Sequence, residues 1–97
     1  MKLIDHRTPD GSRHFSQLRG LAHWQIVCDH VLRLPGAEIN NSVRHELAGA
    51  RLRFTFRGHR FTIRSQQRDL HLIVDDPQCS DLILFEVGLH FEQLAAE

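Results

Sequence analysis

Residues 38–75 alternate between apolar and polar side chains, and this alternation constrains the fold more than any other feature of the sequence. A period of two is typical of strands that bury one face and expose the other. Gly49, the pair Gly58-His59 and the polar run 66–69 interrupt the pattern where turns are expected. The segment therefore predicts a four-stranded antiparallel meander.

A two-residue loop at Gly58-His59 sets the register of these strands, because glycine at the first loop position suits a tight hairpin. Phe56 is then expected opposite Phe61. Continuing this register across the sheet gives the pairs Arg57–Arg60, Phe54–Ile63, Phe61–Val74, Ile63–Leu72, Phe56–Val43 and Leu52–Leu47. The apolar residues of the four strands, apart from Ile39 and Ile73, fall on one face, which predicts a core face and a solvent face.

Helical spacing flanks this segment on both sides. Before it, apolar residues recur at three- and four-residue intervals, at Leu21, Trp24, Val27, Cys28, Val31 and Leu34. These predict a helix that starts near Ser16, or else at Gly20, and ends at 34–36, where proline stops it. A second helix, apolar around most of its circumference, is expected after the sheet, with its start either at Asp76-Pro77 or at Ser80-Asp81.

The predicted fold class is α+β, a two-layer sandwich in which both helices cover one face of the four-stranded sheet. Residues 16–97 are expected to form a single α-β-β-β-β-α domain. Residues 1–15 are treated as an N-terminal strand and turn segment, because 8–12 is a strong turn signal. A short strand or a small hairpin would both fit there.

Charge and cysteine content narrow the class of protein. Twelve basic and twelve acidic residues give a formal net charge of zero, so the whole chain is not expected to act as a polycation. The sequence has no apolar run long enough to span a membrane and no apolar stretch at its N-terminus typical of a signal peptide. Cys28 and Cys79 are too few for a disulfide framework. We therefore expect a cytoplasmic protein with reduced thiols and no membrane partner.

The solvent face of the predicted sheet is unusually rich in arginine. We expect a ligand or partner face there, made of Arg44, Arg53, Arg57, Arg60, Arg64 and His71. Arginines directly opposite each other repel mildly, and a bound anion would relieve this repulsion. Nucleic-acid phosphate, an acidic protein surface or the acidic helix of a second copy would each fit. A merely solvated face in an arginine-rich chain is the alternative.

No constellation in the sequence predicts catalysis, a cofactor or a metal. The eight histidines are scattered, without the tight ligand pairs of metal sites. Glu86 and His90 lie one helical turn apart, which is more typical of a surface contact than of acid–base chemistry. We therefore predict a protein that is not an enzyme, with no catalytic, cofactor-binding or metal-binding residues.

The last helix predicts self-association. Its apolar residues project in more directions than one sheet face and one neighbouring helix can cover. Leu82, Phe85 and Leu89 are the expected homodimer surface. The favoured function is thus a non-enzymatic protein-interaction module that binds itself or another protein. The alternative is nucleic-acid or acidic-ligand binding through the arginine-rich face.

Overall fold

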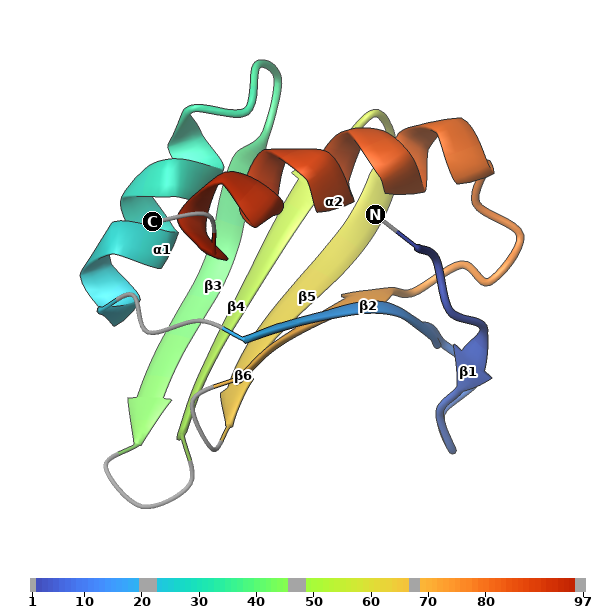
Figure 1. The fold of residues 1–97 in the computed structure, drawn as a ribbon, viewed down its shortest axis with the longest axis horizontal. Helices are drawn as coiled ribbons and strands as arrows, with labels where there is room; N and C mark the ends of the chain where they lie inside the picture. Colours follow the sequence, from blue (N-terminus) through green and yellow to red (C-terminus); the bar gives the residue numbers. More distant parts are fainter. Residues whose placement is uncertain (1, 20–22, 46–48, 67–68, 96–97) are drawn as a thin grey trace.

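The computed structural model describes residues 2–19, 23–45, 49–66 and 69–95, and it shows a compact α+β fold. A six-stranded antiparallel sheet is combined with two helices (Figure 1). The elements in chain order are β1 (His6–Arg7), β2 (Arg13–Arg19), α1 (Trp24–Leu32), β3 (Glu38–His45), β4 (Gly49–Phe56), β5 (His59–Gln66), β6 (Asp69–Val74) and α2 (Asp81–Ala95). Neither helix is long and apolar enough, over its described residues, to cross a membrane.

The sheet has six strands where the sequence predicted four, because the N-terminal segment joins it. The strand order is β1-β2-β6-β5-β4-β3, so the expected meander forms one side and β2 extends it by pairing antiparallel with β6. Residues 16–19, predicted to start a helix, belong to β2. A bulge between His14 and Ser16 interrupts the alternation of β2 where the helix was predicted to start. It lets Phe15 and Leu18, three residues apart as in a helix, both be buried from a strand.

The register between β4 and β5 differs from the predicted one by two residues. Phe54, and not Phe56, lies opposite Phe61. The turn is Arg57-Gly58, one residue earlier than expected, and both residues have positive φ angles, 50° and 77°. This combination is typical of the type I′ hairpin turn. A shift of two residues preserves which face each side chain occupies, so the predicted core face is correct. The register predicted between β5 and β6, with Phe61 opposite Val74, is confirmed.

The register of β3 was predicted wrongly. Val43 lies opposite Arg51, on the outer face, whereas Ile39 lies opposite Phe54 and faces the core. A bulge between Ile39 and Asn41 changes the alternation within the strand. The residue predicted opposite Leu52, Leu47, lies outside the described residues.

The core lies between the inner face of the sheet and the two helices, which are on the same side of the sheet in Figure 1. Phenylalanine rings form its centre. The rings of Phe54 and Phe61 stack with centroids 5.3 Å apart, and Phe91 of α2 approaches Phe54 at 6.0 Å. Phe15 of β2 contacts Phe61 edge-on at 5.9 Å. The rings therefore join the meander, the added strand and the second helix in one cluster.

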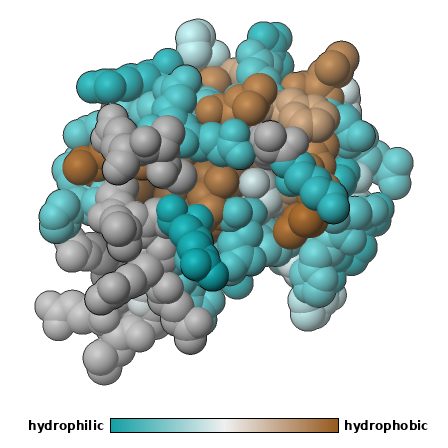
Figure 2. Space-filling model, in the orientation of Figure 1, coloured by the Kyte–Doolittle hydropathy of each residue, from teal (hydrophilic) through white to brown (hydrophobic). Residues whose placement is uncertain are grey.

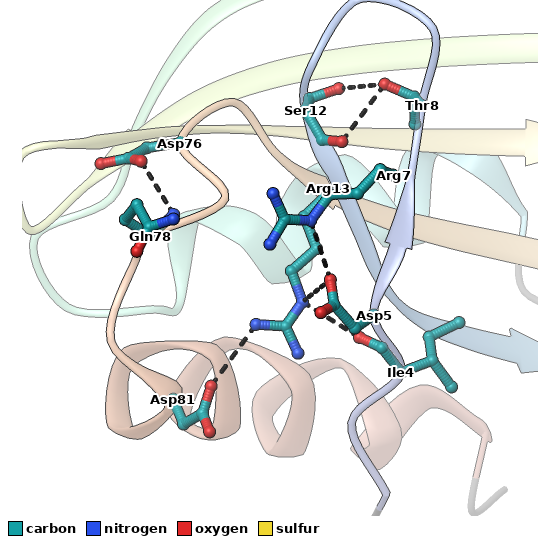
Figure 3. Close-up of polar contacts among 9 residues, drawn as sticks. All are labelled: Ile4, Asp5, Arg7, Thr8, Ser12, Arg13, Asp76, Gln78 and Asp81. Atoms are coloured by element: carbon teal, nitrogen blue, oxygen red, sulfur yellow. Dashed lines mark hydrogen bonds and ion pairs between the residues drawn. The ribbon is translucent and has the colours of Figure 1, made fainter.

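The second helix begins at Asp81, the later of the two predicted starts. The Ser80 hydroxyl oxygen accepts a hydrogen bond from the Leu82 N–H at 3.2 Å, as an N-cap does. Asp76, at the other candidate start, accepts a hydrogen bond from the Gln78 N–H at 2.9 Å and thereby forms a turn before the helix (Figure 3).

Two histidines join the helices to each other. Nε2 of His30 donates to the backbone oxygen of His90, and Nε2 of His90 donates to the backbone oxygen of His30, both at 2.6 Å. Their rings stack with centroids 4.0 Å apart. Burial lowers the pKa of His90, which favours its neutral ring. Glu86 does not pair with His90 but with Arg57, at 2.8 Å.

The two faces of β4 predict different costs of truncation. Replacing Phe54 with alanine should lower the free energy of unfolding by about 3–5 kcal/mol, because the side chain is fully buried in the ring cluster. Replacing the neighbouring Thr55 removes one exposed hydrogen bond to Asn40 and should cost about 1 kcal/mol or less. Urea denaturation measures both. Equal losses would show that the faces of the sheet are assigned wrongly.

Candidate anion-binding groove

A depression of about 610 Å³ lies on the outer face of the sheet, formed by β4, β5 and β6 together with the N-terminal hairpin. Six side chains that are cationic or can become so line it: His6, His14, Arg51, Arg53, Arg64 and His71. We call this depression the basic groove. The lining also includes the carboxylates of Asp10 and Asp75, hydroxyl groups of the hairpin and of β5, and the apolar side chain of Ile73.

Strand pairing brings these side chains together in two neighbouring rows. Arg51, Arg64 and His71 lie directly opposite one another on β4, β5 and β6. The next row places Arg53 beside Thr62 and ends at His14 on β2. Opposed residues in adjacent strands have Cβ atoms about 4.5–5.5 Å apart, so the row concentrates like charges that repel one another.

The hairpin of β1 and β2 forms one side of the basic groove. The carboxylate of Asp10 stabilises the turn of this hairpin. Asp10 accepts hydrogen bonds from the Ser12 hydroxyl at 2.6 Å, from the Ser12 N–H at 3.1 Å and from the Thr8 hydroxyl. The two hydroxyls also contact each other at 2.7 Å (Figure 3). These hydrogen bonds hold the pKa of Asp10 far below its usual range. The Asp10 carboxylate, at the rim of the groove, therefore has its hydrogen-bond partners within the turn.

Arg13 anchors the hairpin to the rest of the molecule. Its side chain is only 12% exposed and pairs with Asp5 at 3.3 Å and with Asp81 at 3.4 Å. Its Nε also donates to the Ile4 carbonyl at 3.1 Å. Figure 3 shows this guanidinium between the N-terminal segment and the start of α2. The wall of the groove is thus held in place by contacts on the helical side of the sheet.

The arginines of the basic groove differ in how far their charge is offset. Arg53 pairs with Asp75 at 3.1 Å, and its buried Nε has no hydrogen-bond partner among the described residues. Arg51 and Arg64 form no ion pair with any residue that the structure describes. Two neighbouring guanidinium groups therefore lack a described counter-charge, and both are exposed to solvent. This arrangement suits an anion with several oxygen acceptors.

The three histidines form a contact chain across the groove. His71 Nδ1 and His14 Nε2 are 3.4 Å apart, and the rings of His14 and His6 meet edge-on with centroids 6.2 Å apart. Burial lowers the pKa of His14, and the positive charges of His71, His6 and Arg64 lower it further, against a hydrogen bond with the backbone of Ser16. The unliganded groove therefore favours a neutral His14.

The structure brings three of the residues of the predicted partner face into the groove, namely Arg53, Arg64 and His71. Arg60 is exposed on β5 outside the groove lining. Arg57 lies in the hairpin turn, where it pairs with Glu86 of α2 and its guanidinium lies 5.3 Å from the ring centroid of Phe56. The shift of the turn by one residue puts it there. The side chain of Arg44 lies outside the described residues.

Sequence reasoning missed Arg51, His6 and His14. Arg51 has the same parity as Arg53, so extending the alternation by one pair would have included it. The two histidines reach the groove only because β2 pairs with β6, a contact between residues more than fifty positions apart. Nothing in the local sequence of residues 6–14 specifies this pairing.

The predicted dimer surface is partly exposed. Leu82 is 81% exposed and Leu89 is 51% exposed, whereas Phe85 is partly buried. Glu86 and Gln93 are exposed on the same stripe of α2. The two leucines thus belong to the solvent-facing side of the helix.

Histidine, cysteine and carboxylate side chains are the residue types that could support metal binding or thiol chemistry. Within the described ranges, no three of these side chains gather in a way that could hold a metal ion. Cys79 is buried, and this burial raises the pKa of its thiol, which disfavours the reactive thiolate.

Comparison of the chain with models of known protein families, with curated proteins and with solved structures gives no match.

Proposed function

We propose that the protein is a non-enzymatic binding module whose basic groove holds a compact anion bearing phosphate or carboxylate groups. The pair Arg51 and Arg64 carries this proposal. The two guanidinium groups lie opposite each other at a concave site, with no described acid to offset them. Charge-assisted hydrogen bonds to a bound oxyanion would replace their mutual repulsion with attraction.

A compact anion fits the groove better than a long polyanion does. Asp10 lines one part of the groove and Asp75 another, so a continuous chain of phosphates crossing it would meet negative charge. Phe and Trp do not occur among the lining residues that the structure describes, whereas single-stranded nucleic acids are commonly held by stacking on such rings. The net charge of zero also gives no general attraction to nucleic acid.

Binding of inorganic pyrophosphate and of citrate, followed by calorimetry at about 50 mM salt, tests this proposal. We expect saturable binding that weakens as salt is added. Arg64→Gln should weaken it by about tenfold or more, because a charge-assisted hydrogen bond is lost. Arg60→Gln is the matched control on the same strand and should leave the affinity unchanged, because Arg60 lies outside the groove lining.

Failure of the wild-type protein to bind either anion would contradict the proposal. Tight binding of a single-stranded oligonucleotide, with a steep dependence on salt and no affinity for the small anions, would instead favour the nucleic-acid alternative.

We propose self-association through α2 as a second function of the same module. Leu82 and Leu89 are the observation that favours it, because both are large apolar side chains left exposed on one helix. Ile26 and Leu32 of α1 are also exposed, at 47% and 63%. Brown apolar surface is visible in the upper part of Figure 2, where Figure 1 places α2. A twofold interface would remove such surface from water.

Light scattering at micromolar concentration tests the second function. The proposal expects a mass of twice the 11.3 kDa of one chain. Leu89→Glu should convert the dimer into a folded monomer, since a charge would enter the interface. Gln78→Glu, an exposed position before the helix, is the control for added charge and should remain dimeric. A monomer mass for the wild-type protein at high concentration would rule out self-association.

A further inference from the structure

We propose that the basic groove binds its anion together with a proton, which is taken up by the contacting pair His14 and His71. This inference rests on the proposed function and adds how binding is regulated. The ligand is a compact dianionic oxyanion, such as a phosphate-monoester or sulfate group. The affinity of the groove for this ligand depends on pH. No covalent step is involved. The anion enters from solvent, and one proton moves from solvent to an imidazole nitrogen.

The histidines lie beside the arginines of the groove, so the positive charge of the arginines acts on them. His71 lies directly opposite Arg64 in the pairing of β5 and β6. His14 Nε2 lies 3.4 Å from His71 Nδ1. An oxyanion held by Arg51 and Arg64 would therefore meet His71 next in the row, with His14 immediately behind it.

The groups around the histidines disfavour a charged imidazole in the free protein. His6 approaches from β1 and Arg64 from β5, and both are cationic or can become so. Neither acid of the lining is among the causes that shift the pKa of His14: Asp75 pairs with Arg53, and Asp10 is held, ionised, within the hairpin turn. Burial lowers the pKa of His14 below that of a free imidazole, about 6.5, and the positive charges of His71, His6 and Arg64 lower it further.

A bound dianion reverses this balance. Its negative charge lies next to the imidazoles and offsets the arginines, so it makes protonation of an imidazole in the pair more favourable. A pKa that is higher in the complex than in the free protein means that binding takes up protons. Affinity must then rise as pH falls, by at most about tenfold per pH unit for each proton taken up. The rise levels off once the histidines of the free protein are themselves protonated.

Sulfate is the appropriate probe, because it keeps two negative charges over the range in which histidine titrates. Phosphate would add a titration of its own near about pH 6. We propose calorimetric titration of the wild-type protein with sulfate from about pH 8 to about pH 5.5. Repeating it in two non-anionic buffers of different ionisation enthalpy counts the protons taken up. The expected result is uptake of between zero and one proton at about pH 7, with affinity increasing toward acid.

Four variants locate the effect. His14→Gln and His71→Gln should each reduce the proton uptake and flatten the dependence of affinity on pH. His23→Gln removes an exposed histidine just before α1, away from the groove, and should leave both unchanged. Arg64→Gln should weaken binding at every pH. The buffer comparison on the wild-type protein needs no variant, so it decides the matter even if a substitution impairs folding.

The outcomes separate the two proposals. Sulfate binding that is weakened by Arg64→Gln but shows no proton uptake and no dependence on pH would overturn this inference and leave the proposed function standing. Proton uptake that persists unchanged in both histidine variants would also overturn it. Absence of sulfate, pyrophosphate and citrate binding at any pH would overturn the proposed function itself.

Discussion

Stacking of Phe54 on Phe61, with Phe91 of α2 against Phe54, is the interaction on which the rest of the structure depends. It assigns the inner face of β4 and β5 to the core. Because side chains alternate along a strand, the same contact turns Arg51, Arg53 and Arg64 outward. The concentration of positive charge on the outer face is thus a direct consequence of how the inner face packs. The fold tolerates the repulsion between the outer-face arginines because burial of the rings stabilises it by more than the repulsion destabilises it.

Pairing of β2 with β6 then converts a flat charged surface into a concave site. It brings His14 beside His71 and raises the hairpin of β1 and β2 as a wall. Arg13 holds that wall through Asp5 and Asp81, and Asp10 fixes its turn. Asp5 and Asp81 pair with Arg13, and Asp75 pairs with Arg53, so Arg51 and Arg64 are left without a described counter-charge. Structural ion pairs and the candidate binding site are therefore linked through the same few acidic residues.

The sequence was sufficient to predict the two faces of β4, β5 and β6, because a period of two survives a register error of two residues. This is why Phe54 was correctly placed in the core although its partner was wrong. Bulges could not be predicted. The bulge next to Phe15 imitates helical spacing, and the one after Ile39 changes the alternation in β3. In both places the sheet pairing overrides the local pattern.

The candidate site could be predicted only where it lies within one meander. Arg53, Arg64 and His71 follow from alternation alone, whereas His14 enters through a long-range strand pairing that no local signal specifies. Mapping of amide chemical shifts during titration with sulfate tests the central claim most directly. The account predicts that the shifted amides cluster around the basic groove, at Thr62, His71 and Ser12. Shifts confined to the α1–α2 side, at Asp29 and Gln93, or no saturable shifts at all, would contradict it.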